Sequence, residues 1–249
     1  MVKEKIFWRL VSTMTVQTQQ AQVVRIRQLA PQVRELTLLP SEWKVSFKPG
    51  QWVSLHLPIG QRPPLLRAYS MAEPESTTGT LVLVFDRVPQ GAGSGYLFRL
   101  QERDMVLMAG PYGRFAPPEP LTQDLLLIAR YTGIVPLHCI IKHLFANEVS
   151  TKIMLVYGGP SQQELIYHDE FVELASRHHS FHYVPILLSG NGNRGEDYQR
   201  VMEAIRLLVR GRRDVFPMIC GTQSFVHPLR TYFAELGFGK KEVRHETYD

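Results

Sequence analysis

The feature that most constrains the fold of this chain is a change of pattern near residue 120. Before it, short runs rich in β-branched residues alternate apolar and polar positions, as in Val53-Ser54-Leu55-His56-Leu57, and glycines and prolines separate them. The runs span residues 22–28, 33–39, 52–57, 65–71, 80–87 and 104–108, with one short helix expected over 95–100. Short, regularly punctuated strands of this kind predict a six-stranded antiparallel β-barrel.

After residue 120, continuous apolar runs alternate with helical segments. Strands are expected over 125–129, 153–157, 183–188, 216–220 and 242–247, and helices over 137–145, 164–177, 198–209 and 225–236. Buried strands that alternate with helices predict a parallel, five-stranded α/β sheet. The expected organisation is an N-terminal extension over 1–20, a barrel domain over 21–117, a Pro-rich linker, and an α/β domain over 121–249.

The composition excludes several classes of protein. The 249 residues include only two cysteines, Cys139 and Cys220, which are too few for a disulfide framework or a four-cysteine iron–sulfur site and which suit a reducing cytoplasm. The most apolar stretch is interrupted by Arg130 and Lys142, so no membrane span is expected. The net charge of +5 is scattered, which favours an acidic protein partner over nucleic acid. No metal site is predicted.

Two segments of the first half carry side chains that suit a phosphate-bearing ligand. Arg67-Ala68-Tyr69-Ser70 ends the fourth run and supplies a guanidinium for phosphate, a flat aromatic face and a hydroxyl donor. Gly91-Ala92-Gly93-Ser94 precedes the expected helix, where glycines let the backbone approach a phosphate. The alternatives are an ordinary strand end and a glycine-rich turn with Ser94 as the helix cap. Gly110-Pro111-Tyr112-Gly113 is interpreted as a plain turn.

The second half has polar or glycine-containing segments where its strands end. Arg130-Tyr131-Thr132-Gly133 follows the first parallel strand and leads through Pro136 into a helix. Gly158-Gly159 follows the second strand, Cys220-Gly221 ends the fourth, and the chain ends Glu246-Thr247-Tyr248-Asp249. The carboxyl edge of an α/β sheet is where nucleotides bind. Alternatives are ordinary loops, a core cysteine and a frayed terminus.

The order and spacing of these segments resemble the ferredoxin–NADP reductase family over about residues 20–249. The resemblance implies an FAD site in which Arg67 meets the pyrophosphate from one side and the backbone at Gly93 and Ser94 holds it from the other. Tyr69 is expected to pack on the isoalloxazine and Ser70 to lie near flavin N5. Ala68 and Gly91 are expected to belong to the same FAD site. It implies a nicotinamide nucleotide held by Thr132, Gly133, Pro136, Gly158 and Gly221. Cys220 is expected next to the nicotinamide, Tyr248 as a lid over the flavin, and Glu246 as a proton-relay or charge partner.

The implied activity is transfer of a hydride from NADH or NADPH to FAD, followed by release of electrons to a separate acceptor. The sequence has no fused, cysteine-rich ferredoxin domain, so the expected acceptor is an acidic carrier, an oxygenase component or a small molecule. NADH is slightly favoured, because Ser189-Gly190 stands where NADP-specific members of the family carry Ser-Arg.

One departure from the family leaves a second hypothesis open. Arg130 and Tyr131 replace the two residues, the second of them a glycine, that usually precede Thr132-Gly133. Either the bulky Tyr131 blocks the approach of a pyrophosphate, or Arg130 adds positive charge that helps to bind it. With a blocked site, the protein is instead an FAD-binding electron-transfer or regulatory subunit that does not use NAD(P)H.

Overall fold

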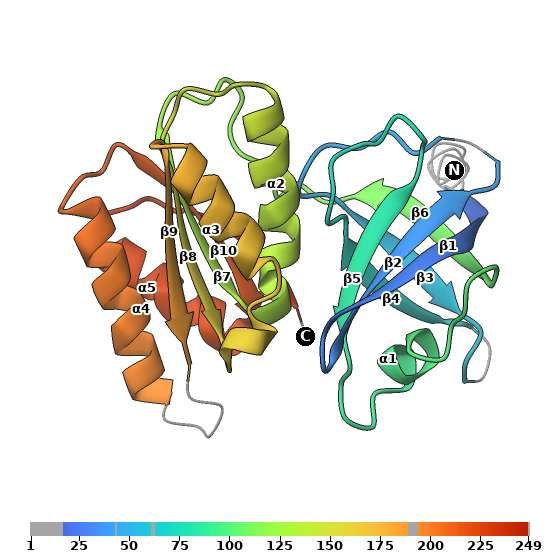
Figure 1. Ribbon diagram of the computed structural model, residues 1–249. Coiled ribbons are helices and arrows are strands. Elements are labelled where there is room, and N and C mark those ends of the chain that lie inside the picture. The colour runs from blue at the N-terminus through green and yellow to red at the C-terminus, as the bar shows by residue number, and fades with distance from the viewer. Residues whose placement is uncertain (1–16, 43, 61–62, 189–193, 249) are drawn as a thin grey trace, which may run out of the picture.

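The structure is a computed structural model that describes residues 17–42, 44–60, 63–188 and 194–248. An antiparallel barrel is followed by a parallel α/β domain, so the fold class predicted from the sequence is confirmed (Figure 1). The barrel contains β1 (Thr18–Ala30), β2 (Val33–Pro40), β3 (Trp52–Leu57), β4 (Leu65–Ser70), β5 (Leu81–Asp86), α1 (Ala92–Leu97) and β6 (Met105–Tyr112).

The six barrel strands are ordered β4-β3-β6-β1-β2-β5. In β3, positions alternate strictly between buried and partly exposed, so that Val53, Leu55 and Leu57 face the barrel core as their spacing predicts. An isolated bridge between Met71 and Leu83 brings the end of β4 to β5, which joins the two edges of the sheet.

The barrel differs from the sequence prediction where β1 begins and where β6 ends. β1 begins at Thr18, which pairs with Ala109, so residues 18–20 of the expected extension belong to the sheet. Residues 1–16 lie outside the described residues. The prediction of a plain turn over 110–113 is wrong, because β6 continues to Tyr112 and pairs it with Trp52 across a register shift. That irregularity lets the strand continue through a glycine and a proline.

The helices begin at other positions than the sequence predicts, and two of these differences concern segments discussed below. α1 spans Ala92–Leu97 rather than 95–100, so Gly93 and Ser94 lie inside it and Gly91 is its N-cap. The helix expected over 164–177 begins at His168, because Tyr167 adopts a left-handed backbone conformation with φ of 63°. Glu164 lies in the preceding 3-10 turn, η3 (Gln162–Glu164).

The α/β domain is a parallel sheet ordered β11-β10-β7-β8-β9. Its elements are β7 (Asp124–Arg130), η2 (Tyr131–Gly133), α2 (Ile134–Ala146), β8 (Ile153–Gly159), α3 (His168–Arg177), β9 (Phe181–Leu187), α4 (Arg194–Val209), β10 (Val215–Thr222), α5 (Gln223–Glu235) and β11 (Arg244–Tyr248). All seven residues of β8 are buried, as expected of a central parallel strand that reads as one apolar run.

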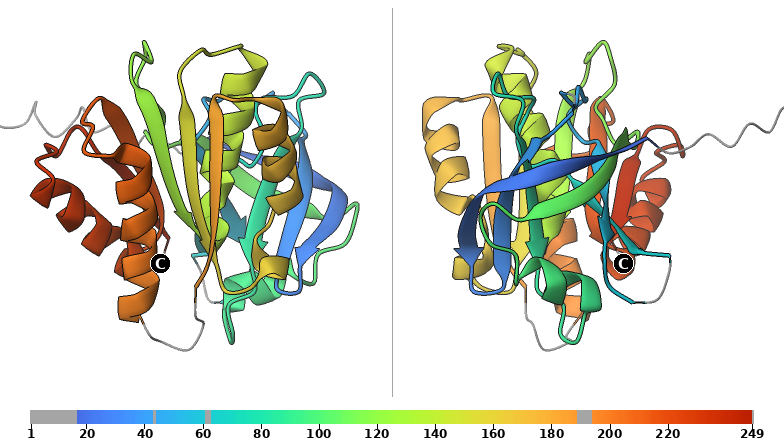
Figure 2. Two further views of the ribbon diagram at one scale, coloured as in Figure 1. Left: turned by 60° about the vertical axis from the view of Figure 1, so that its left-hand side comes forward. Right: turned by 90° about the vertical axis from the view of Figure 1, so that its right-hand side faces the viewer.

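Helix α2 lies between the parallel sheet and the barrel, whereas α4 and α5 cover the opposite face of the sheet (Figures 1 and 2). One apolar cluster continues through this seam: it includes Ala72 and Val84 of the barrel together with Ile140 of α2 and Leu127 of β7. The two domains therefore share a core, and α2 is the element that joins them. No helix among the described residues is long and apolar enough to cross a membrane.

Candidate functional site at the domain seam

The strand order of the parallel sheet points to the place where a nucleotide binds. The chain runs from the central strand β7 to β8 and β9 on one side, and then returns to β10 and β11 on the other. Ligands of such sheets bind at the carboxyl ends of the strands on either side of the reversal. Here these strands are β7 and β10, and η2 follows directly on β7.

Residues from both domains meet at this edge. Ser70, at the end of β4, is buried, and its Oγ shares a hydrogen bond of 3.1 Å with the hydroxyl of Tyr248 at the end of β11. In the parallel pair of β10 and β11, Cys220 stands opposite Glu246, and Thr222 opposite Tyr248. The four residues predicted to be catalytic, Ser70, Cys220, Glu246 and Tyr248, are therefore brought together.

Burial sets the protonation of this group. It raises the pKa of the Cys220 thiol, an effect that Glu246 increases and a hydrogen bond with Tyr248 partly offsets, so the sulfur is a neutral thiol rather than a thiolate. Burial also raises the pKa of Tyr248 well above its ordinary value. The edge therefore presents neutral hydroxyl and thiol groups.

Glu246 is the one carboxylate of this group. Its Oε2 is buried and has no hydrogen-bond partner among the described residues. Burial raises its pKa to about 7, because the charged form loses hydration that nothing here replaces. A carboxyl group with such a pKa exchanges a proton near neutral pH, which suits a proton relay.

On the barrel side, Arg67 is exposed on β4 and lies against Gly93 of α1. Its guanidinium Nη1 donates to the carbonyl of the preceding residue, Leu66, over 2.8 Å, which leaves its other donors for a ligand. A Cβ at Gly93 would lie only 3.3 Å from Cγ of Arg67, so the glycine lets the Arg67 chain and the helix approach. The structure thus brings the two predicted phosphate-binding segments side by side.

Other residues of these segments have packing partners within the barrel. Tyr69 packs edge-on against Phe85, with ring centroids 5.9 Å apart, and burial raises its pKa to about 12. Ser94 does not cap α1: its Oγ accepts from the backbone N–H of Val88 over 3.0 Å and lies 3.3 Å from the Gly91 carbonyl. The interpretation of Ser94 as the helix cap is therefore wrong, and its side chain holds its own loop together.

The residues predicted to hold a nicotinamide nucleotide surround the carboxyl edge. Thr132 Oγ1 donates to Asp86 Oδ1 of the barrel over 3.3 Å, a contact between the domains that no sequence motif predicts. A Cβ at Gly133 would clash with the backbone of Cys220, so this glycine allows η2 to lie directly on β10. Pro136 lies in the first turn of α2, where a proline is tolerated.

Two further predictions concern the ends of β8 and β9. Gly158 is the penultimate residue of β8, and a Cβ there would meet the side chain of Leu188. The Ser189-Gly190 pair, on which the preference for NADH rests, lies outside the described residues.

Tyr131 occupies the position where the resemblance led us to expect a glycine. Its backbone is left-handed, with φ of 51°, and its half-buried ring packs against the shared core. Burial raises its pKa to about 12, and the carboxylates of Asp86 and Glu164 add to the effect, which locates the ring near both. Because η2 contacts both β5 of the barrel and β8, Tyr131 lies at the seam between the two domains.

Two observations test whether FAD fits these residues. The exposed guanidinium of Arg67 beside Gly93 suits the two negative charges of a pyrophosphate. The buried, unpaired oxygen of Glu246 lies in the same group as the neutral hydroxyls of Ser70 and Tyr248, which suits a polar, flat ring system. The residues present fit the cofactor.

Comparison with known proteins identifies the family. Residues 20–116 match the oxidoreductase FAD-binding domain, and residues 127–230 match the oxidoreductase NAD-binding domain. The chain is 32% identical over 240 residues to ferredoxin–NADP reductase B of Sorangium cellulosum, an alignment that covers 92% of this chain and 97% of that protein. The chain belongs to the ferredoxin–NADP reductase family. It is an FAD- and nicotinamide-dependent oxidoreductase, and the family membership predicted from its motifs is confirmed.

Other relatives are longer proteins. The reductase subunit of the aromatic O-demethylase of Amycolatopsis is 34% identical over 173 residues, which make up 67% of this chain and 50% of that protein. A cytochrome P450 reductase structure from Amycolatopsis superposes with a TM-score of 0.80 at 26% identity, over 93% of this chain and 69% of that one. The chain spans about half the length of the oxygenase reductases that it matches.

Proposed function

We propose that this protein takes electrons from a reduced nicotinamide and passes them, through FAD, to a separate acceptor. The observation that carries the proposal is the meeting of Ser70 from the barrel with Tyr248 from the α/β domain, next to Cys220 and Glu246. When bound, FAD supplies the redox chemistry, accepting a hydride and returning electrons one at a time. The protein binds, orients and shields the reacting groups.

The barrel residues bind and orient the flavin nucleotide in this proposal. Arg67 pairs with its pyrophosphate, and the backbone from Gly91 through Gly93 and Ser94 approaches the same phosphates. The backbone at Ala68 and the ring of Tyr69 line the isoalloxazine side of β4.

The residues at the seam act on the reacting edge. Ser70 donates a hydrogen bond to the ring, and Glu246, with a pKa near neutrality, holds or releases a proton there. The ring of Tyr248 excludes water and is displaced when a nicotinamide enters, while Cys220 provides a neutral, polarisable wall. Thr132, Gly133, Pro136, Gly158 and Gly221 line the path of the nucleotide.

The proposed donor is NADH rather than NADPH, because no Ser-Arg pair stands at positions 189–190 of the sequence to grip a 2′-phosphate. The proposed acceptor is an oxygenase component or an acidic electron carrier. Relatives of the chain include reductase components of propane 2-monooxygenase and terephthalate 1,2-dioxygenase, and the net charge of +5 favours an acidic partner. We place the protein in the cytoplasm, where its free, buried Cys139 and Cys220 stay reduced.

The test is to record the visible spectrum of the purified protein and then to add NADH and NADPH separately without oxygen. We expect a flavin band that bleaches with either donor, faster with NADH. A flavin band that neither donor bleaches would favour a subunit whose flavin is reduced by a protein partner. A colourless protein that cannot be reconstituted with FAD would overturn the proposal.

A further inference from the structure

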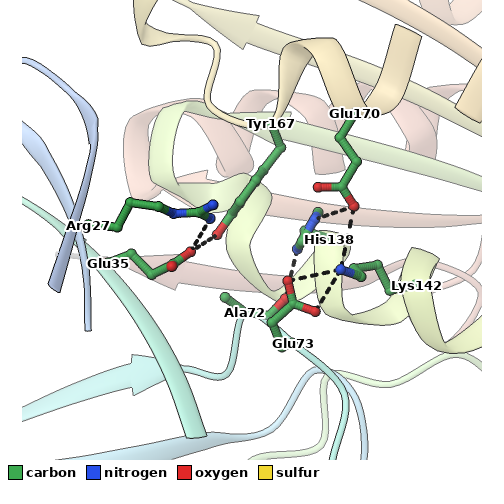
Figure 3. Close-up of polar contacts among 8 residues, drawn as sticks. All are labelled: Arg27, Glu35, Ala72, Glu73, His138, Lys142, Tyr167 and Glu170. Carbon is green, nitrogen blue, oxygen red and sulfur yellow. Dashed lines mark hydrogen bonds and ion pairs between the residues drawn. The ribbon is translucent and has the colours of Figure 1, made fainter. Parts of the chain in front are cut away.

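A polar cluster with a buried histidine at its centre links the two domains, apart from the group of Ser70, Cys220, Glu246 and Tyr248 (Figure 3). At its centre is His138 of α2, whose side chain is fully buried. The imidazole stacks on the ring of Tyr167, with centroids 3.8 Å apart and planes 7° from parallel. Charged and polar groups are rarely buried without partners, so the contacts of this ring indicate what it does.

Each nitrogen of His138 faces an oxygen. Nδ1 donates to the carbonyl oxygen of Ala72 over 2.7 Å; a carbonyl only accepts, so Nδ1 carries a proton. Nε2 lies 3.1 Å from Oε1 of Glu170, a close contact that lacks the alignment of a hydrogen bond. Although burial alone would raise the pKa of Glu170, the His138 ring and Lys142 hold it below its ordinary value. The imidazole is thus fixed between a carboxylate and the backbone of the barrel.

Ala72 is two residues beyond Ser70, and its peptide groups are held on both sides. Its N–H donates to the carbonyl of Val82 over 2.8 Å, next to the bridge between Met71 and Leu83. Its carbonyl accepts from His138. The segment that carries Ser70 out of β4 is therefore fixed by β5 on one side and by α2 on the other.

The same helix is also fixed to the other half of the site. α2 begins directly after Gly133, and a side chain at Gly133 would clash with the backbone of Cys220. One rigid helix thus contacts β10 at its start and holds the barrel segment through His138 in its second turn. Cys220 in turn stands in register with Glu246 of β11, the strand that ends at Tyr248.

The cluster also contains side-chain contacts that join the two domains without involving the backbone of residues 70–72. Lys142, one turn further along α2, pairs with Glu73 at 2.8 Å and with Glu170 at 3.6 Å. The Tyr167 hydroxyl donates to Oε2 of Glu35 over 3.2 Å. These contacts supply matched controls, because they join the same two domains at other points.

We propose that His138 is a positioning residue for hydride transfer: through the Ala72 carbonyl it fixes Ser70 relative to Cys220 and Tyr248. The inference rests on the proposed function, since it concerns alignment of a flavin held by the barrel with a nicotinamide held by the α/β domain. A displacement of about 1 Å between reacting groups slows such a reaction by up to about a hundredfold. Loss of the His138 hydrogen bond therefore slows hydride transfer without weakening nucleotide binding.

The test compares four variants of the full chain loaded with FAD. His138→Phe keeps a stacking ring but removes the donor to Ala72, and His138→Asn restores a donor close to the position of Nδ1. Tyr167→Phe removes only the hydrogen bond to Glu35. Glu170→Gln weakens the contacts of this side chain with Nε2 of His138 and with Lys142, and it remains available if His138→Phe fails to fold.

Three quantities are measured for each variant. They are the rate of hydride transfer, the affinity for nucleotide, and the rate of amide hydrogen exchange over residues 70–73 and 244–248. We expect His138→Phe to slow transfer by about tenfold or more, with the dissociation constant of oxidised nucleotide unchanged, and to speed exchange in both segments. His138→Asn should restore the rate of hydride transfer and the slow amide exchange of the parent. Glu170→Gln should slow transfer and speed exchange by less than His138→Phe does. Tyr167→Phe should leave both rates near those of the parent.

An unchanged rate or unchanged exchange in His138→Phe would overturn the inference, as would equal effects in Tyr167→Phe. If His138→Phe does not fold, unchanged exchange in Glu170→Gln overturns it. A parent protein that neither nucleotide reduces overturns the proposed function instead, and the exchange comparison then decides by itself whether His138 fixes the Ser70 segment.

Discussion

The side chains of Ser70 and Tyr248 share a hydrogen bond of 3.1 Å, although 178 positions separate them in the chain. One belongs to an antiparallel barrel and the other to the edge strand of a parallel sheet. Their contact exists only because α2 and the shared apolar core hold the two domains in one arrangement. The proposed reacting edge is therefore a property of the seam and of neither domain alone.

Ser70→Ala tests the hydroxyl at this edge. We expect FAD to stay bound, because the proposed contact of Arg67 with the pyrophosphate is untouched. Hydride transfer should slow by about a hundredfold, the usual effect of removing one preorganised donor. Stopped-flow bleaching of the flavin band by NADH measures the rate. Ser46→Ala, at an exposed serine bonded to Glu75 in the same domain, is the control. A rate equal to that of the control would remove Ser70 from the mechanism.

Arg67→Lys tests the proposed pyrophosphate contact. Lysine keeps the charge but loses the forked pair of donors, so we expect FAD affinity to fall by about ten- to a hundredfold. Fluorescence titration of the apoprotein with FAD measures this. Arg25→Lys, at an exposed position on β1, should bind FAD as the parent does. Equal affinities for the two variants would contradict the assignment of Arg67.

Sequence patterns predicted those parts of the fold in which local preference and burial agree. The alternation in β3 and the continuous apolar run in β8 each require one kind of strand, and both strands form as expected. The start of α1 was misplaced because two glycines give segment 91–94 a poor helix propensity, which Ser94 overcomes through its contacts with Val88 and Gly91. The start of α3 was misplaced because nothing in the sequence marks the left-handed Tyr167.

In the candidate site, too, some residues could be predicted from the sequence and others only the structure reveals. Ser70, Cys220 and Tyr248 carry a recognisable order along the chain, and the structure brings them together. Asp86 and His138 carry no such sign, because an aspartate at a strand end and a histidine in an apolar helix are both common. Their partners, Thr132 and Ala72, belong to the opposite domain, so only the packed seam reveals their roles.

Glu246→Gln tests the buried carboxyl through stability. In the folded protein the pKa of Glu246 is about 7, above its ordinary value of 4.5, so the folded state holds a proton that the unfolded chain releases. The free energy of unfolding of the parent should therefore fall as the pH rises from about 4.5 to about 7. Glutamine does not titrate, so this fall in the free energy of unfolding is absent from the variant. At pH 8 the variant should be more stable than the parent by at most roughly 3 kcal/mol. At pH 4.5 the two proteins should have similar stability.

Urea unfolding of the apoprotein at the two pH values measures the difference. Glu203→Gln, at an exposed position on α4, is the control and should show no comparable gain at pH 8. A variant at Glu246 that is no more stable than the parent at pH 8 would show that this carboxyl group is hydrated or paired in solution.

Tyr131→Gly tests how the departure from the family affects the nucleotide. The ring packs at the seam between the two domains, and the backbone of Tyr131 has the left-handed φ of 51° that glycine adopts without strain. We expect the variant to bind oxidised nucleotide about tenfold more tightly, because a pyrophosphate approaches the η2 backbone more closely without the side chain. Isothermal titration with NAD and NADP measures both affinities.

Glu148→Gly is the matched control for this change, because Glu148 also has φ of 51° but is exposed beyond the end of α2. It should leave nucleotide affinity unchanged, so that a gain in Tyr131→Gly reports on the side chain rather than on a relaxed backbone. Suppose that the parent binds neither nucleotide and that one of them reduces the flavin of Tyr131→Gly. Tyr131 then closes the nucleotide site in the natural protein, and a partner protein reduces the flavin. If parent and variant bind equally well, the ring lies clear of the nucleotide path, and Arg130 is the residue of this loop to test next.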